Sequence, residues 1–298
     1  MAERPHIDIS SLPDASLTSF DFREASFFQH HGSVLPAPAT VRELAEPGSN
    51  TPQPPPVKFP HLDLLVKFGP HVSVTEALSL WMIRKAFGSR VSVPEVYAWR
   101  LDQQEVYIYM QLVRGDSLKE RWESLSLSDR AIVCNDLHQV LSSLRSAVVV
   151  PDSSFIGSVN GGPITDIIFE GMPDSGPFPR VESFHNWLSS LLWYKLPRSP
   201  NRTDPWREYL PDNEAIVLTH GDLHRSNIII SPTGSPHVIS IVDWAQAGWY
   251  PAYWEYCKAC YTASFKDEWR IDWIPKFLDR WDDEFLTLSE YTHAIGSV

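Results

Sequence analysis

Residues 220–244 constrain the fold of this chain more than any other segment. They read HGDLHRSN, then three isoleucines, a turn-rich stretch at 231–236, a second apolar run, and finally Asp243 and a tryptophan. Two short apolar runs around a connector rich in Pro, Gly and Ser predict a β-hairpin. Such a hairpin places Asn227 close to Asp243 at one end, and Asp222 precedes Asn227 by five residues. The sequence therefore predicts that three oxygen-bearing side chains meet at one point.

Two acids and an amide in this order suit a magnesium-dependent reaction at phosphate. Mg²⁺ prefers hard oxygen ligands and keeps several waters, so Asn227 and Asp243 with phosphate oxygens are a sufficient set. Asp222 would then accept or orient the proton of an attacking hydroxyl, because phosphoryl transfer needs alignment and charge neutralisation from the protein. The plainer alternative is that Asp222 and Asn227 only cap turns, as Asp and Asn often do. The occurrence of all three residues in this order favours the chemical interpretation.

Five segments carry a wider pattern: HGDLHRSNIII, IVDWAQAGWYPAYWEYCKA, LLVKFG with the following Glu76, VPEVYAW, and YIYMQLVRGDSL. On these residues, from about residue 27 to about residue 281, the chain resembles the aminoglycoside phosphotransferase family of the protein-kinase-like superfamily, in its fungal branch. H-x-D-x-x-x-x-N followed by an Asp is the catalytic-loop and metal-loop pattern of that superfamily. The resemblance implies a bilobal α+β protein-kinase-like fold, with a small antiparallel-sheet N-lobe and a larger, mainly helical C-lobe. It also implies ATP and Mg²⁺ as cofactors.

Lys67 lies in the apolar run LLVKF, a strand context that normally excludes lysine. Because burying an unpaired ammonium is costly, this lysine needs an anionic partner. Glu76 begins an apolar pattern of helical spacing that extends to Phe87. By resemblance, Glu76 holds Lys67 so that the lysine binds the α- and β-phosphates of the nucleotide. The alternative is an edge-strand lysine whose amino group reaches solvent.

Two further strands are expected at 91–100 and 105–113. By resemblance, the second leads into the hinge between the lobes, where the backbone of Gln111 and Val113 hydrogen-bonds the adenine and Met110 lies next to the pocket. The expected organisation is an N-terminal tail at 1–26, an N-lobe at 27–113 and a C-lobe at 114–298.

The segment before Lys67 departs from the family pattern. Kinases cover the phosphates with a glycine-rich loop whose N–H groups approach closely, whereas residues 44–56 contain one glycine and five prolines. Proline lacks the N–H that would bind phosphate. A stiff linker or lid is therefore expected here, with Gly48, Ser49 and Asn50 left to donate a few N–H groups.

The second half of the chain is expected to be mostly helical. Helices are predicted at 128–144, 181–196 and 269–288, with a Gly- and Pro-rich loop at 151–179. By resemblance, the segments after residue 150 wall the acceptor pocket. Their apolar and aromatic residues fit a hydrophobic or aromatic small molecule at least as readily as an aminosugar.

Two histidines flank Asp222 and are candidate catalytic residues with it. His220 is expected to orient the loop through backbone hydrogen bonds, and direct chemistry is the alternative. His224 occupies the position where protein kinases place a lysine that touches the γ-phosphate, so it is expected either to reach the phosphate or to face solvent. Arg225 is a further source of positive charge.

The composition of the chain limits the classes of molecule that it is expected to bind. The formal net charge of −12 argues against nucleic-acid binding, which depends on a basic surface. It permits a cationic substrate, although an acidic surface kept for solubility explains it as well. The polar N-terminus is not a secretory signal, and no apolar run has membrane-spanning length, so a cytoplasmic protein with no membrane partner is expected, as a monomer or weak dimer. Cys257 and Cys260 are expected to be core cysteines, because no second pair completes a zinc site.

Three classes of function remain open. The first is an ATP-dependent O-phosphotransferase acting on a hydroxyl of a small molecule, such as a secondary metabolite or an aminoglycoside-like compound. The second is an iron enzyme that uses His220, Asp222 and a distant histidine, with His237 and His293 as candidates. The third is a kinase-fold protein that has lost or altered phosphoryl transfer and serves in binding or in other secondary-metabolite chemistry.

Overall fold

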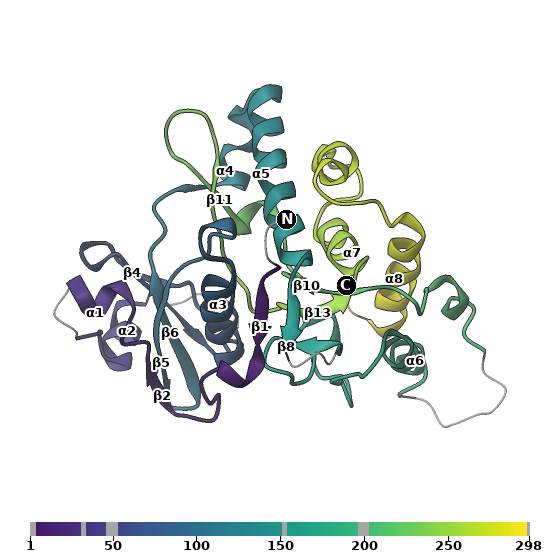
Figure 1. Cartoon of the computed structure of the whole chain (residues 1–298), viewed down its shortest axis with the longest axis horizontal. Helices are drawn as coiled ribbons and strands as arrows, with labels where there is room; N and C mark the ends of the chain where they lie inside the picture. Colours follow the sequence, from purple (N-terminus) through teal and green to yellow (C-terminus); the bar gives the residue numbers. More distant parts are fainter. Residues whose placement is uncertain (1–3, 31–33, 46–52, 151–153, 196–202, 297–298) are drawn as a thin grey trace.

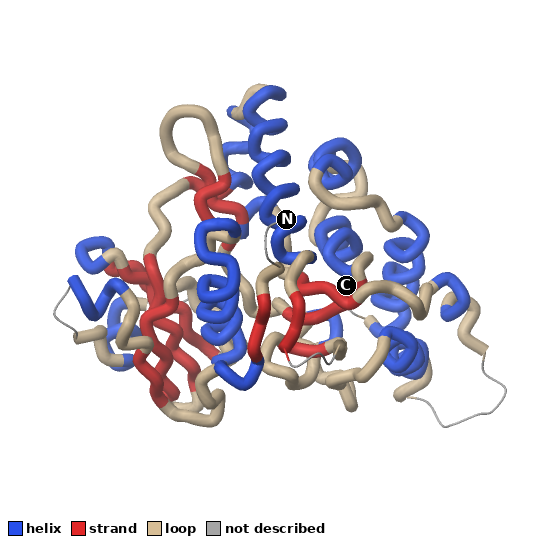
Figure 2. Tube along the Cα trace, viewed as in Figure 1, coloured by secondary structure: helices blue, strands red, loops and turns tan. Residues whose placement is uncertain are grey.

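The structure, a computed structural model, describes residues 4–30, 34–45, 53–150, 154–195 and 203–296. One lobe is built on a five-stranded antiparallel sheet, and helices dominate the other, larger lobe (Figures 1 and 2). This is the protein-kinase-like α+β architecture that the sequence predicts.

The five-stranded sheet has the order β2-β5-β6-β4-β3. Its strands are Ser19–Asp21 (β2), Val57–Phe59 (β3), Leu64–Gly69 (β4), Val96–Asp102 (β5) and Glu105–Gln111 (β6). β5 and β6 form a hairpin in which Gln103 and Gln104 have φ angles of 51° and 68°. Positive φ at both central residues is what a two-residue turn matched to the strand twist requires. β5 and β6 are the central strands, and they carry most of the buried aromatic side chains of the sheet.

β4 and the helix α3 (Val74–Phe87) carry the charged candidates Lys67 and Glu76. Leu64 and Val66 in β4 are fully buried, and strand alternation puts Lys67 on the opposite face. α3 packs beside β5 and β6 (Figure 1) and has Glu76 in its first turn. It ends at Gly88, whose φ of 56° favours glycine.

The strand expected at 91–100 begins only at Val96. Pro94 lies in the missing part and has no N–H to give to a sheet. The carbonyl of Ser92 instead accepts the N–H of Ile241, at 3.0 Å. The residues before Val96 therefore contact the second half of the chain.

The described part of the segment predicted as a tail at 1–26 is folded. β1 (His6–Asp8) pairs in parallel with β8 (Val148–Val150), and β2 pairs with β5. Ile7 and Phe22 are buried, each with 2% of its surface exposed, and this burial explains why the segment is held. The short helices α1 (Ser26–His30) and α2 (Pro38–Leu44) follow. The lobe boundaries at residues 27 and 114 stay predictions.

The C-terminal half holds the remaining helices: α4 (Leu118–Arg121), α5 (Leu127–Arg145), α6 (Val181–Leu191), α7 (Trp254–Tyr261) and α8 (Asp282–Ile295). α5 confirms the helix predicted at 128–144; Ser126 and Asp129 form a capping box at its start. The single helix predicted at 269–288 is wrong. Pro275 lies within it, and the chain forms a π-helical turn (Trp269–Trp273) and a 3-10 turn (Ile274–Lys276) before α8.

Two small sheets surround the segment that the sequence singles out. One has the order β10-β13-β9, with strands Ile216–Thr219, Gly248–Pro251 and Gly157–Ser158. The other has the order β12-β11-β7, with strands Val238–Ile241, Ile228–Ile230 and Asp116–Ser117. β11 and β12 pair antiparallel, which confirms the predicted hairpin. β10 ends just before His220, so both sheets border the catalytic candidates.

His185 in α6 is expected to make the free energy of unfolding depend on pH. Its Nδ1 lies 2.8 Å from a carboxylate oxygen of Asp212, and its Nε2 lies 2.7 Å from the hydroxyl of Tyr253. Burial lowers the pKa of His185 to about 4, and the hydrogen bond with Asp212 only partly opposes this. The unfolded chain, with a histidine pKa of about 6.5, takes up the proton first. We therefore expect full stability above about pH 6.5 and a loss of about 3 kcal/mol as the pH falls to about 4.

Urea unfolding at several pH values between 7.5 and 4.5 checks this expectation. His185→Gln should be less stable than the parent at pH 7.5, and the difference should shrink as the pH falls. His138→Gln, on the exposed face of α5, is the matched control. A difference between parent and His185→Gln that is constant with pH would show that His185 is not held neutral.

Candidate functional site

Lys67 joins three elements of the fold. Its Nζ lies 2.9 Å from both carboxylate oxygens of Glu76 on α3 and 2.7 Å from Oδ1 of Asp243, which follows β12. Burial alone would lower the pKa of Lys67, but the two carboxylates raise it above its ordinary value, so the amine stays charged. Burial raises the pKa of Glu76 to about 7, while Lys67 acts in the opposite direction. The ammonium group of Lys67 therefore links the sheet lobe to the second lobe.

Asp243 and Asn227 lie at the same end of the hairpin, where the sequence predicts them. The N–H of Val242 donates to the carbonyl of Asn227, at 2.9 Å. Asp243 has a φ of 63°, which is uncommon for a non-glycine residue and typical of functional sites. Burial acts to raise the pKa of Asp243, but Lys67 reverses the effect and lowers it. This carboxylate is therefore ionised.

Asp222 contacts Asn227 directly. The amide nitrogen of Asn227 donates to the main-chain carbonyl of Asp222 at 2.9 Å and to its Oδ2 at 3.2 Å. In the described part of the chain, the amide oxygen of Asn227 has no protein donor, so this atom is available to a cation. Burial raises the pKa of Asp222 to about 7, and the charge of Asp243 adds to the rise. Positive charge placed between these two acids would relieve their repulsion.

His220 is fully buried behind this cluster. Its Nδ1 accepts the N–H of Asp222 at 3.1 Å, and its Nε2 donates to the carbonyl of Val242 at 3.0 Å. The tautomer with hydrogen on Nε2 follows from these two partners. Burial lowers the pKa of His220 to about 4, so the ring is neutral, and it packs edge-on against Trp244. Both ring nitrogens are engaged by backbone, which suits orientation of the loop and leaves no atom for a substrate.

Glu255 in α7 also holds the loop of His220 and Asp222, and the sequence does not single it out. Its carboxylate accepts the N–H of His220 at 2.6 Å and the N–H of Gly221 at 3.3 Å. Gly221 has a φ of 78°, and a Cβ there would lie 2.8 Å from the carbonyl oxygen of Gln246. The available signal was an acid within the apolar run at 249–261. Buried N–H groups need such an acceptor.

A buried ion pair is the second feature that sequence reasoning misses. Nζ of Lys258 lies 2.7 Å from Oδ1 of Asp166 and 3.1 Å from Oε1 of Gln246, and the ion pair is almost fully buried. Gln246 follows Asp243 by three residues, so the pair fastens the loop before α6 to the candidate metal segment. Asp166 lies in a loop with no recognisable pattern, so the sequence held no signal for this contact.

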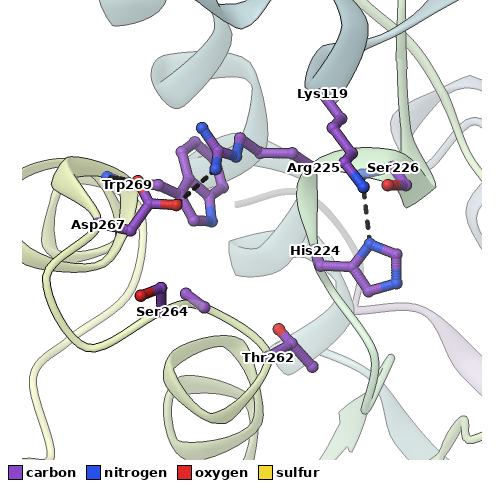
Figure 3. A pocket seen from close by; sticks show the side chains of 9 residues that line it. Lys119, His224, Arg225, Ser226, Thr262, Ser264, Asp267 and Trp269 are labelled. Atoms are coloured by element: carbon purple, nitrogen blue, oxygen red, sulfur yellow. Dashed lines mark hydrogen bonds and ion pairs between the residues drawn. The ribbon is translucent and has the colours of Figure 1, made fainter.

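His224 lies between Asp222 and a surface pocket. Its Nδ1 accepts the N–H of Ser226 at 3.2 Å, and its Nε2 lies 3.6 Å from Oδ2 of Asp222. Burial lowers the pKa of His224. The pocket has a volume of about 270 Å³, and Lys119 and Arg225 are among the side chains that line it (Figure 3). His224 is therefore half-buried, with one face toward the carboxylate and another toward open space.

The residues expected at the hinge lie at and just after the end of β6. Met110 is buried, and the N–H of Gln111 donates to the carbonyl of Glu95 at 2.8 Å. Only the carbonyl of Gln111 is therefore left for a ligand. The N–H of Val113 has no protein acceptor among the residues that the structure describes. This is a free donor at the junction of the two lobes.

The proline-rich segment is described only in its last part. Gly48, Ser49 and Asn50 lie outside the described residues. The Nε2 atom of Gln53 donates to the carbonyl of Phe68 at 2.6 Å. A Cβ at Gly69 would lie 2.7 Å from Pro54, so the end of the segment packs directly on β4.

Comparison with known proteins bears on this geometry. A model of the phosphotransferase enzyme family matches residues 63–292, more than half of the chain. The chain belongs to the phosphotransferase enzyme family. No curated protein matches it. Among solved structures, aminoglycoside phosphotransferase APH(4)-Ia matches with 14% identity and a TM-score of 0.50, over 78% of this chain and 76% of that one. The streptomycin–ATP–APH(2")-IIa ternary complex matches with 13% identity and a TM-score of 0.49, over 90% and 86%. At this identity, the likeness to APH(4)-Ia is one of fold.

The described residues contain no group of three or more His, Cys, Asp or Glu side chains that could hold a metal ion. His237, one of the two histidines considered for an iron site, pairs with Asp136 at 3.0 Å. Cys257 and Cys260 are free and buried in α7. The described helices include none that is long and apolar enough to cross a membrane.

Proposed function

We propose that the protein is an ATP-dependent O-phosphotransferase that acts on a hydroxyl of a small molecule. The observation that carries this proposal is the ammonium of Lys67, held at 2.7–2.9 Å between Glu76 and Asp243. A lysine fixed in this way is suited to bind nucleotide phosphates at the junction of the lobes. Membership of the phosphotransferase enzyme family supports the same reaction class.

The residues present fit Mg²⁺. Oδ1 of Asp243 is engaged by Lys67, so its second oxygen and the amide oxygen of Asn227 are the two protein ligands we assign. One charged and one neutral oxygen suit a hard cation that keeps several waters. Bound there, Mg²⁺ would neutralise phosphate charge.

Asp222 is the residue we assign to the proton of the acceptor. The acceptor hydroxyl loses its proton to the Asp222 carboxylate, and its oxygen forms a bond to the γ-phosphorus of ATP. The bond between that phosphorus and the bridging oxygen breaks, and ADP leaves with the electron pair. His220 and Glu255 fix the loop, so the carboxylate is aligned before the reaction. His224 stands next to it and can contact the transferred phosphate.

The hinge contacts complete the nucleotide site. The free N–H of Val113 donates to the adenine in this proposal, and the carbonyl of Gln111 accepts from it. Met110 lies at the back of the adenine pocket. The N–H of Gln111 takes no part, because Glu95 already accepts it.

One observation favours the alternative that transfer has been lost or altered. β3 is the edge of the described sheet, and the stretch just before it, residues 53–56, includes three prolines. Proline supplies no N–H to phosphate. A protein of this kind would bind a nucleotide or a metabolite without transferring phosphate.

Nucleotide binding separates these possibilities from an unrelated function. We expect the non-hydrolysable analogue AMP-PNP to bind in the presence of Mg²⁺ and to bind much more weakly with EDTA. Lys67→Met should weaken binding at least tenfold, because a hydrogen-bonded charge on phosphate contributes roughly 1.5–3 kcal/mol. Titration calorimetry measures both effects, with Lys85→Met on the exposed face of α3 as control. If AMP-PNP binds equally well with Mg²⁺ and with EDTA, or does not bind detectably, the proposed nucleotide site is wrong.

A screen of hydroxyl-bearing compounds then tests transfer. The enzyme, Mg²⁺ and ATP are incubated with each compound, and mass spectrometry detects the gain of one phosphate. AMP-PNP binding without any transfer across a broad library would favour the alternative.

A further inference from the structure

The pocket beside the catalytic loop carries more positive than negative charge. Its charged lining residues are Lys119 on α4, Arg225 on the catalytic loop and Asp267 in the segment after α7. Nη2 of Arg225 lies 2.5 Å from Oδ2 of Asp267, and the other oxygen of Asp267 accepts the N–H of Trp269 at 2.9 Å. The single acid of the lining is therefore already neutralised. Lys119 is exposed and has no ion pair within the part of the chain that the structure describes.

Apart from Asp222, two acids on segments next to the pocket are also paired. Glu268 contacts Arg130 at 2.5 Å, and Asp116 contacts Arg121 at 2.8 Å. No free carboxylate among these residues compensates Lys119. Lys119 therefore adds a positive charge at the site that none of these acids neutralises.

Two aromatic rings hold Arg225 in position. The guanidinium of Arg225 lies 5.6 Å from the ring of Trp122 and 5.9 Å from the ring of Trp269. Arginine has five N–H donors, and the ion pair with Asp267 uses only part of them. Figure 3 shows Lys119 and Arg225 on one side of the pocket, with the hydroxyls of Ser264 and Thr262 on the other. The lining therefore offers donors and hydroxyls, a combination suited to an oxygen-rich anion.

The pocket is adjacent to the chemistry. His224 lines it, and Nε2 of His224 lies 3.6 Å from Oδ2 of Asp222. A small molecule in the pocket can thus reach Asp222 with a hydroxyl at one end and Lys119 with an anionic group at the other.

We propose that this pocket is the acceptor site and that the acceptor carries a phosphate or carboxylate group as well as the hydroxyl that is phosphorylated. Lys119 and Arg225 bind the anionic group. A cationic aminosugar would meet two positive side chains in the pocket lining, and the nearest unpaired carboxylate is Asp222, which the acceptor hydroxyl occupies in the proposed reaction. A purely apolar compound would make no ionic contact with Lys119. This inference rests on the proposed phosphotransferase function, because it names the substrate class of that same site.

A matched set of sugars tests the charge preference without requiring turnover. Glucosamine, glucose, glucuronate and glucose 6-phosphate have similar rings and differ mainly in charge. Titration calorimetry of the full chain without ATP measures the affinity for each. We expect the two anionic sugars to bind at least tenfold more tightly than glucose, with glucosamine weakest. Lys119→Ala should reduce the affinity for the anionic sugars about tenfold, and Lys119→Glu should abolish their binding, because a charge-assisted hydrogen bond is lost or reversed.

Lys85→Ala is the control, because it removes an exposed lysine from α3 and leaves the pocket intact. Glucuronate and glucose 6-phosphate also distinguish a carboxylate from a phosphate as the preferred group. The proposal is overturned if neither anionic sugar binds at 20 mM, if glucosamine binds best, or if Lys119→Ala acts no more strongly than Lys85→Ala.

Two further results distinguish a failure of the anionic-acceptor proposal from a failure of the proposed phosphotransferase function. Lys119→Ala could weaken AMP-PNP binding while the sugars are unaffected. That result would assign Lys119 to the nucleotide and overturn the acceptor proposal, with phosphoryl transfer still supported. Conversely, selective binding of the anionic sugars by a protein that does not bind AMP-PNP would support the anion site and sink the kinase function.

Discussion

Asp222→Asn should abolish phosphate transfer while leaving the fold and AMP-PNP binding in place. The amide cannot accept the proton of the acceptor hydroxyl, and a general base contributes roughly 10²–10⁴-fold to a rate. Asn has the same shape, so its contact with Asn227 and the surrounding backbone hydrogen bonds need not be disturbed. We therefore expect turnover to fall about 10³-fold or more, with the KM for ATP nearly unchanged.

The measurement is ADP release coupled to acceptor phosphorylation, together with circular dichroism and thermal unfolding. Asp14→Asn, a surface acid of the N-terminal segment, is the matched control and should retain parental activity. More than a tenth of parental turnover in Asp222→Asn would remove this residue from the role of base.

Asp243→Ala is expected to reduce turnover about as much as Asp222→Asn, but through loss of Mg²⁺ binding and not through loss of the base. It removes a ligand we assign to Mg²⁺ and one of the two carboxylates that hold Lys67. Turnover should fall by about 10³-fold or more, and AMP-PNP binding should lose its dependence on Mg²⁺. Stability should change by roughly 1 kcal/mol or less, because the Asp243 side chain is 40% exposed and Lys67 keeps Glu76 as a partner.

Raising the Mg²⁺ concentration distinguishes a ligand from a merely structural acid. If Asp243 binds the metal, even high Mg²⁺ should restore little activity, and Mn²⁺ should behave in the same way. Asp272→Ala, which changes an exposed acid in the π-helical turn at Trp269–Trp273, is the control. Full activity in Asp243→Ala, or unfolding at ordinary temperature, would contradict the assignment.

The parts of the site that could be predicted from the sequence are those that short patterns encode. The hairpin that brings Asn227 next to Asp243 follows from two apolar runs and a turn. The pairing of Lys67 with Glu76 follows from a lysine in an apolar strand, since that lysine needs a nearby anion. Both pairs are formed by neighbouring elements.

The parts that could not be predicted depend on contacts between distant segments. Lys67 and Asp243 are 176 residues apart, and Lys258 and Asp166 are 92 apart. Nothing in a local pattern indicates that such residues meet, because the fold alone brings them together. Glu255 reaches its partners in the same way, from a helix 35 residues beyond His220.

Proline accounts for the errors in element boundaries. Pro94 delays the start of β5, and Pro275 breaks the helix expected at 269–288. The N-terminal strands are a different case. β1 is three residues long and pairs in parallel with β8, more than a hundred residues away, so its short alternation carried too little signal.

The pocket beside His224 shows a further limit of reasoning from composition. The apolar and aromatic residues of the C-terminal half fit a hydrophobic acceptor at least as readily as an aminosugar, and this expectation stays untested. In the structure, the tryptophans near the pocket support Arg225 from the side, and the polar groups face the open space. Composition counts the residues of a region, whereas specificity depends on which of them reach the surface of one cavity.

The parallel pairing of β1 with β8 gives the two lobes a second connection. The chain passes from β1 to β2 in the first lobe, and it crosses again after β6, so the lobes are joined at two separate places. Two fixed points define an axis. We therefore expect relative motion of the two lobes to be mainly a rotation about the line through these two crossings, with little twisting of one lobe over the other.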